Sequence, residues 1–148
     1  MRPLVEVGVS DYFGTPRIYG TYNKRTKKWT PVAGALPVPH GGVDFRAKVG
    51  TPVRVINSGR VLLVHNFPIP GTEGKMIVVD HGSGILSLYL HLSKFEVIKG
   101  DLVVKGQTIA LSGATPKGTP PHLHLMVRVN DINVDPLEFI DTINKYLR

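Results

Sequence analysis

Two short stretches of the chain carry side chains at spacings that could do chemistry. In "PHLHLM", His122 and His124 are separated by one residue, and in a strand such residues point to the same face, about 7 Å apart. In "PHGGVDF", two glycines and a valine separate His40 from Asp44. Imidazole and carboxylate groups bind zinc and also act as general acids and bases. His40, Asp44, His122 and His124 are therefore candidate site residues. The alternatives are solvated strand histidines and a His–Asp bond that stabilises a turn.

The two stretches reinforce each other as parts of one metal site. A catalytic zinc site takes three protein ligands and keeps one position for water. Four candidate side chains for three places leave one histidine over, which would be placed as a general base or hydrogen-bond partner. The spacing alone leaves open which histidine that is.

His91 is a third candidate, in the segment "LSLYLHLSK". Strict alternation predicts one strand face with Ser87, Tyr89 and His91, and the opposite face with Leu88, Leu90 and Leu92. His91 would then lie off the continuous apolar face and could contribute to the site from a separate strand, or it could be an exposed strand histidine. We expect no role in the site for His65 and His81.

The elements that must position these residues are predicted to be mainly short strands. A chain of 148 residues with 42% apolar residues suits one globular domain. Asn57-Ser58-Gly59 predicts a hairpin turn between two β-rich runs, and "HGSG", two Lys-Gly pairs and Asn130-Asp131 mark further turns. Short strands at this spacing favour an all-β sandwich or barrel-like fold.

The two ends of the chain differ from this pattern. Asp135 as N-cap, Pro136 at the first helical position and Glu138 three residues after the cap predict a short C-terminal helix. Residues 1–39 are irregular and rich in proline near their end, which predicts arms and loops with one or two edge strands.

Composition limits the partners. The net charge of +7 indicates an anionic partner or surface, but no basic helix with interleaved aromatic residues or RNA-binding sheet motif is present, so nucleic acid is not expected. Cysteine is absent, which excludes disulfides and Cys-based zinc sites. No apolar run is long enough to span a membrane, and the first residues do not form a secretory signal.

Taken in order, the motifs resemble those of the lysostaphin-type (LytM-like) zinc endopeptidases, which cut bacterial peptidoglycan. "HGGVD" matches the His-x-x-x-Asp of that family, "YLHLS" its Tyr-x-His-Leu, and "HLH" its His-x-His after a proline. The flanking segments "GTPV", "VVDHGSG" and "VDPLEF" are similar as well. The resemblance covers about residues 40–140.

The resemblance implies a role for each candidate. His40, Asp44 and His124 would bind Zn²⁺, while His122 and His91 would orient the attacking water, take its proton and support the developing oxyanion. The implied reaction is hydrolysis of peptide bonds in peptidoglycan stem peptides or cross-bridges.

The resemblance also implies an architecture and a location. The fold would be a two-layer antiparallel β sandwich of the duplicated hybrid motif type, with residues 40–148 as the peptidase domain and residues 1–39 as an arm packing on it. An anionic cell-wall polymer would suit the positive charge. The location would be periplasmic or cell-wall associated, with the export signal outside this chain.

One departure from the family pattern and two other functions stay open. Leu125-Met126 replaces the usual Phe-Glu after His-x-His, which could change the hydrogen bonding behind the ligands. A catalytically silent domain of the same fold could bind wall or regulate another hydrolase, but such relatives usually lack some of the five polar positions filled here. A sugar phosphotransfer carrier would use two facing histidines and would not need Asp44.

Overall fold

The computed structural model describes residues 8–17, 20–23, 25–26, 28–31, 38–69, 72–117 and 119–146. Its elements, in chain order, are β1 (Val9–Asp11), β2 (Pro16–Arg17), β3 (Gly20–Asn23), β4 (Lys28–Pro31), β5 (Val38–Pro39), β6 (Val43–Arg46), β7 (Pro52–Arg54), β8 (Gly59–Phe67), β9 (Gly74–Asp80), β10 (Ile85–Phe95), β11 (Leu102–Val103), β12 (Thr108–Ser112), β13 (His122–Val129), β14 (Ile132–Val134) and α1 (Pro136–Tyr146).

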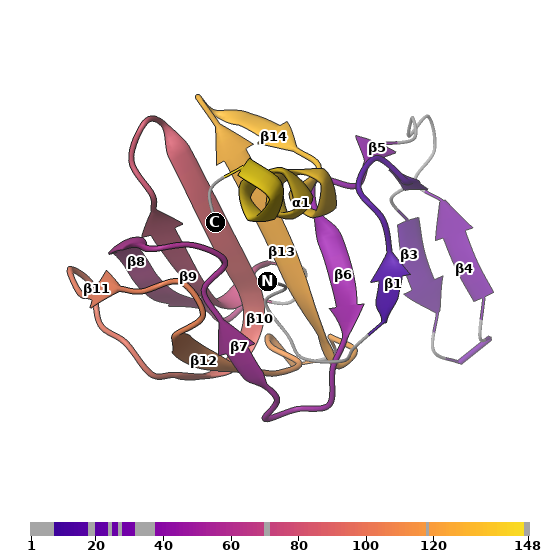
Figure 1. Ribbon diagram of the computed structural model, residues 1–148. Coiled ribbons are helices and arrows are strands. Elements are labelled where there is room, and N and C mark those ends of the chain that lie inside the picture. Colours follow the sequence, from indigo (N-terminus) through magenta and orange to yellow (C-terminus); the bar gives the residue numbers. More distant parts are fainter. Residues whose placement is uncertain are drawn as a thin grey trace.

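One antiparallel sheet organises the molecule (Figure 1). Its strands follow the order β1-β6-β13-β10-β9-β8-β11. The long strand β10 pairs with β13 along its first half and with β12 along its second half, and β12 continues the pairing to β7. The prediction of a mainly β, antiparallel fold with a C-terminal helix is confirmed, and the sheet does not close into a barrel.

The core lies between the long strands and the layer formed by β7, β12 and α1. Phe45 from β6, Tyr89 from β10, and Leu123 and Leu125 from β13 are fully buried against Val53 and Ile109 of the covering layer and Ile140 of the helix. Burial of this apolar surface is the main stabilising contribution to the fold. The opposite face of the sheet carries a second, smaller cluster, formed by Met76, Val78, Leu88 and Leu90.

Most predicted turns are present. The backbone amide of His81 donates to the carbonyl of Ile85 at 2.9 Å across the "HGSG" turn, which joins β9 to β10. Asn130 and Asp131 adopt left-handed φ values of 49° and 66°, as a two-residue hairpin turn between β13 and β14 requires.

The predicted C-terminal helix is also present. The carboxylate of Asp135 accepts a hydrogen bond from the amide of Leu137 at 3.0 Å, which is the expected N-cap contact. Ile140 and Ile143 are buried, and α1 lies against β13 (Figure 1). Leu147, near the end of the expected helix, lies outside the described residues.

Two sequence predictions are wrong. The segment Asn57-Ser58-Gly59 does not join a hairpin, because β7 pairs with β12 and β8 pairs with β9 and β11. The alternation along β10 also fails at its end. The register shifts between Tyr89 and Leu92, and His91 has a left-handed φ of 63°, so Leu92 joins Tyr89 in the main core.

The N-terminal region contains more strand than predicted. Five short strands, β1 to β5, lie within the described part of residues 8–39. β1 pairs with β6 and so joins the main sheet, while β2 pairs with β5 and β3 with β4.

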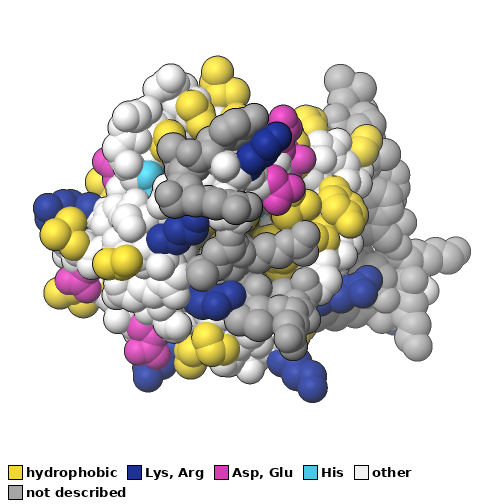
Figure 2. Space-filling view, in the orientation of Figure 1, with side chains coloured by type: hydrophobic (Ala, Val, Ile, Leu, Met, Phe, Trp, Pro, Cys, Tyr) yellow, Lys and Arg dark blue, Asp and Glu magenta, His cyan; other side chains and the backbone are white. Residues whose placement is uncertain are grey.

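The basic side chains do not gather into a single patch on the face of the molecule shown in Figure 2. On the face shown in Figure 2, Lys and Arg side chains are scattered among other side chains. An anionic polymer as partner therefore stays a prediction from composition. Among the described residues, no helix has the length and apolar character needed to cross a membrane.

Candidate metal centre and histidine pair

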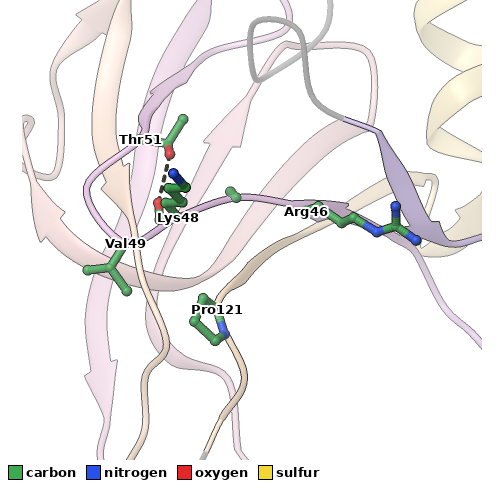
Figure 3. A pocket seen from close by; sticks show the side chains of 6 residues that line it. Arg46, Lys48, Val49, Thr51 and Pro121 are labelled. Atoms are coloured by element: carbon green, nitrogen blue, oxygen red, sulfur yellow. Dashed lines mark hydrogen bonds between the residues drawn. The ribbon is translucent and has the colours of Figure 1, made fainter.

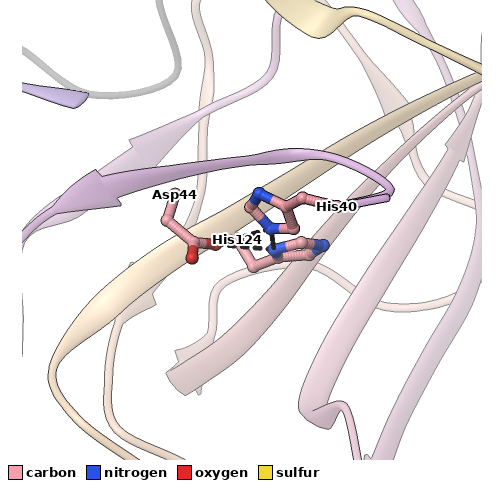
Figure 4. A group of neighbouring side chains, drawn as sticks. All are labelled: His40, Asp44 and His124. Atoms are coloured by element: carbon pink, nitrogen blue, oxygen red, sulfur yellow. Dashed lines mark hydrogen bonds and ion pairs between the residues drawn. The ribbon is translucent and has the colours of Figure 1, made fainter. Parts of the chain in front are cut away.

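The pairing of β6 with β13 brings the two histidine stretches together. Asp44 on β6 is the cross-strand partner of His124 on β13, and His40 lies in the loop that enters β6 (Figure 4). His40 and Asp44 are buried, with 3% and 8% of their surface exposed. The loop before β6, β6 itself and the distant strand β13 thus deliver three potential ligands to a single point.

The three side chains present a compact triangle of donor atoms. His124 Nδ1 lies 2.6 Å from Asp44 Oδ1 and 3.1 Å from His40 Nε2, and His40 Nε2 lies 3.4 Å from Asp44 Oδ1. Ligand atoms at about 2.0–2.2 Å from a tetrahedral zinc ion are separated by about 3.3–3.6 Å. Small outward shifts would therefore fit the triangle to zinc, and two imidazoles with one carboxylate are a donor set that zinc accepts.

Gly42 shows why the loop between His40 and Asp44 needs glycine. A Cβ at this position would collide with the carbonyl oxygen of Leu125 and would lie 3.0 Å from His124 Nε2. Only glycine lets the loop approach β13 this closely, and that approach carries His40 to His124.

The electrostatics of the triangle keep Asp44 ionised. Burial alone would raise the pKa of Asp44, but the hydrogen bond from His124 and the positive charges of His124, His122 and His40 outweigh it and lower the pKa to about 2. A carboxylate that stays ionised can bind a cation throughout the neutral pH range.

His91 and His122 form a second pair beside the triangle. Their ring centroids lie 4.8 Å apart, and the ring of His91 lies 6.2 Å from that of His124. His91 Nδ1 bonds the carbonyl of Thr115 at 2.7 Å, and His122 Nδ1 bonds the carbonyl of Pro120 at 2.7 Å. Because carbonyl oxygens only accept, both Nδ1 atoms donate a proton to their carbonyl partners, and Nε2 of each ring is left for the site.

The unusual backbone of His91 is what brings its ring to this place. Its left-handed φ interrupts the alternation of β10, and its amide donates to the carbonyl of Glu73 at 3.0 Å. Strain of this kind in a non-glycine residue collects at functional sites. Burial, followed by the positive charges of His122 and His124, lowers the pKa of His91, although the Thr115 carbonyl and Asp44 act in the opposite direction. The ring is therefore neutral at neutral pH.

An apolar groove extends from the histidines across the sheet, and sequence reasoning did not anticipate it. Leu90 is the cross-strand partner of His124, and Leu88 that of Met126, so all four side chains share one face. Leu88, Leu90 and Met126, together with Val78, line a hollow of about 430 Å³, which Glu73 and Arg128 border. The Leu88 and Leu90 alternation in the sequence was the available signal, and it indicated only a continuous apolar face.

A second hollow, of about 750 Å³, is lined by the segment that follows β6 and by Pro121, the residue before His122 (Figure 3). Arg46, the cross-strand partner of His122, and Lys48 contribute its basic side chains. Thr51 closes the turn at its edge by donating its hydroxyl to the Lys48 carbonyl at 2.7 Å. Each hollow is thus lined by a cross-strand partner of a site histidine: Leu90 opposite His124 in the apolar one, and Arg46 opposite His122 in the partly basic one.

The remaining two histidines do not join the site. His65 is exposed on β8 and contacts the edge of Phe67, with ring centroids 4.4 Å apart. His81 bonds the carbonyl of Ser58 at 2.8 Å and the hydroxyl of Ser87 at 2.7 Å.

Comparison with known families identifies the class of protein to which this fold and donor set belong. The profile of peptidase family M23 matches residues 38–136, which include all five of the polar side chains described above. The chain belongs to this family.

Individual relatives agree with this assignment. The chain is 43% identical over 112 residues to peptidoglycan DD-endopeptidase ShyB of Vibrio cholerae, a match that covers 76% of this chain and 25% of ShyB. It is 39% identical over 105 residues to lysostaphin of Staphylococcus simulans, covering 68% of this chain and 21% of lysostaphin. The chain therefore spans about a quarter of the length of these relatives.

Solved structures share the fold. A zinc-containing peptidase from Vibrio cholerae superposes with a TM-score of 0.72 at 35% identity, over 90% of this chain and 37% of that one. The catalytic domain of lysostaphin from Staphylococcus simulans gives a TM-score of 0.63 at 33% identity, over 84% of this chain and 90% of that domain.

Proposed function

We propose that this chain is a zinc-dependent endopeptidase that hydrolyses peptide bonds in the stem peptides or cross-bridges of bacterial peptidoglycan. The observation that carries the proposal is the convergence of His40, Asp44 and His124 on one point, with two further histidines beside it. Membership of family M23 and the peptidoglycan-cleaving relatives support the reaction and the substrate.

The three converging residues would hold the metal. His40 Nε2, His124 Nδ1 and an oxygen of Asp44 face one another within hydrogen-bond distance. A zinc ion bound there would supply a Lewis acid that polarises the peptide carbonyl and makes a water molecule more acidic.

His91 and His122 would move the proton. Each ring is fixed through Nδ1 by a backbone carbonyl, so Nε2 of each ring is left for the reaction. His122 Nε2 lies 3.7 Å from Asp44 Oδ1, which places it beside the metal ligands. In this position the pair can accept a proton from water and then stabilise the developing negative charge as donors.

The two hollows, each lined by a cross-strand partner of a site histidine, would receive the substrate chain. A peptide that crosses the site would lie with one side on the Leu88, Leu90 and Met126 surface and the other near Arg46. We further propose that the protein acts in the periplasm or at the cell wall, where peptidoglycan lies.

The test is digestion of purified sacculi, with mass spectrometry of the released fragments and counting of new amino termini. We expect fragments from the wild type, none after zinc removal by a chelator, and recovery when zinc is restored. His65→Ala, a histidine substitution on the exposed part of β8, is the matched control and should digest like the wild type.

The same assay separates the catalytically silent alternative. If neither the wild type nor His122→Ala releases fragments, the chain is not an enzyme of this kind; if both release them equally, the catalytic role proposed for His122 fails. A phosphotransfer carrier is disfavoured, because it would not need an ionised Asp44 at 2.6 Å from His124.

A further inference from the structure

The candidate ligand His40 is held by a segment that precedes the region matched by the family profile. Its backbone amide donates to the Thr15 carbonyl at 2.9 Å, and its carbonyl accepts from the amide of Gly14 at 2.9 Å. Its ring Nδ1 donates to the Tyr12 carbonyl at 3.0 Å. The turn that follows β1 therefore contacts the backbone donor, the backbone acceptor and one ring nitrogen of a single residue.

The ring contact determines which nitrogen of His40 is available to a metal. The Tyr12 carbonyl only accepts, so Nδ1 carries the proton and Nε2 keeps its lone pair. That lone pair faces His124 and Asp44. Asp11 Oδ2, at 3.5 Å from Nδ1, adds negative charge on the side away from the metal. Partners of this kind orient a ligand histidine and raise its basicity.

The contact is separable from the rest of the site. β1 pairs with β6 through only two residue pairs, Val9 with Phe45 and Asp11 with Asp44. On its other edge β6 pairs with β13 through four residue pairs. Displacement of the segment would therefore release His40 and leave Asp44 and His124 opposite each other.

We infer that Asp11–Thr15 is a positioning element of the metal centre: it fixes the tautomer and direction of His40, and the zinc affinity of the chain depends on it. This inference rests on the zinc site proposed above. The element lies outside residues 38–136, the region that the family profile covers.

Gly14 offers a clean way to disturb the segment. Its φ is +79°, and a Cβ there would meet no atom within 4 Å. Gly14→Val therefore acts through backbone conformation and not through a clash, since a branched residue resists this φ. Gly100 has a φ of +95° and the same open surroundings, in a turn remote from His40, so Gly100→Val is the matched control.

The experiment measures zinc affinity by competition with a chelator of known affinity, in the full chain. We expect about a 10- to 100-fold weaker affinity for Gly14→Val and a change within about 2-fold for Gly100→Val. Gly14→Ala imposes less strain and gives the same comparison if the valine variant does not fold.

A second measurement reports which nitrogen of the His40 ring carries the proton. Nitrogen-15 NMR of the zinc-free protein should find Nδ1 of His40 protonated in the wild type and in Gly100→Val, and a mixture of tautomers in Gly14→Val. Equal affinity for wild type and Gly14→Val, or equal loss in both glycine variants, would overturn the inference. Absence of zinc binding by the wild type would instead refute the proposed function.

Discussion

Two groups of histidine-containing hydrogen bonds lie on the same sheet, and they differ in what their ring nitrogens face. At the candidate site, nitrogens of His40 and His124 converge on a carboxylate oxygen. In the second group, His81 bonds Ser87, Ser87 bonds Tyr89 at 2.9 Å, and the Tyr89 hydroxyl accepts from the amide of Ile56 at 3.0 Å.

The second group of hydrogen bonds leaves no histidine nitrogen available to a ligand. Both nitrogens of His81 have protein partners, and the chain ends at a backbone amide inside the core. Burial raises the pKa of Tyr89 to about 12, against the opposing effect of its hydrogen bonds with Ser87 and Ile56. Burial likewise lowers the pKa of His81, although the Ser58 carbonyl and Asp80 raise it. Such a network stays neutral and stabilises the fold.

The comparison teaches how a ligand histidine differs from a structural one. At the candidate site His40 and His122 each bond a backbone carbonyl through Nδ1 and turn Nε2 toward Asp44, while His124 turns Nδ1 toward the same carboxylate. In the His81 group no nitrogen is left to face a ligand. Substitutions in the two groups should therefore have different consequences: loss of activity in the first and loss of stability in the second.

The largest expected effect is on turnover in His122→Ala. Removal of a proton acceptor in the transition state costs about 10²- to 10⁴-fold in rate, so kcat on purified sacculi should fall by that factor while the free energy of unfolding changes little. His65→Ala serves as the control. A kcat within about threefold of the wild type would show that His122 takes no part in the reaction.

Tyr89→Phe should show the opposite pattern. It deprives the buried Ile56 amide and Ser87 hydroxyl of their partner, and an unsatisfied buried group costs about 1–3 kcal/mol. Urea denaturation should show this loss, with kcat per folded molecule unchanged. A drop in kcat without loss of stability would mean that the two groups are not independent.

The smallest effect concerns pH. Because the pKa of His81 is lowered in the folded state, the unfolded chain binds more protons below the ordinary histidine pKa of about 6.5. Stability of the zinc-free protein should therefore fall as pH decreases from about 7.5 to 5.5. His91, whose pKa is also lowered, adds to this slope.

His81→Gln should flatten the slope measured by urea denaturation at these two pH values. His91 would supply the slope that persists. An identical slope in wild type and His81→Gln would contradict the assignment of His81 as a neutral buried group.

The sequence predicted the parts of the molecule that depend on local pattern. Period-two spacing correctly gave His122 and His124 a common face, and the Asp135 cap and the Asn130-Asp131 turn were correct for the same reason. These features depend on residues that are close in the chain, so a single segment contains the needed information.

Long-range pairing was harder to predict. The partner of β7 is β12, more than fifty residues later, and no local signal names it. The sequence also carries no local signal for the bulge at His91, because the bulge arises where β10 changes from one partner strand to another. The contacts of Tyr12–Thr15 with His40 could not be predicted, since they involve backbone atoms that every residue possesses.

The central claim is that zinc binding and proton transfer belong to different side chains of one site. Isothermal titration of zinc into the wild type, Asp44→Ala and His122→Ala tests it most directly. We predict one zinc ion per wild-type chain, binding to His122→Ala within about threefold of the wild-type affinity, and at least about 100-fold weaker binding to Asp44→Ala. Zinc retained by Asp44→Ala, or lost from His122→Ala, would contradict the account.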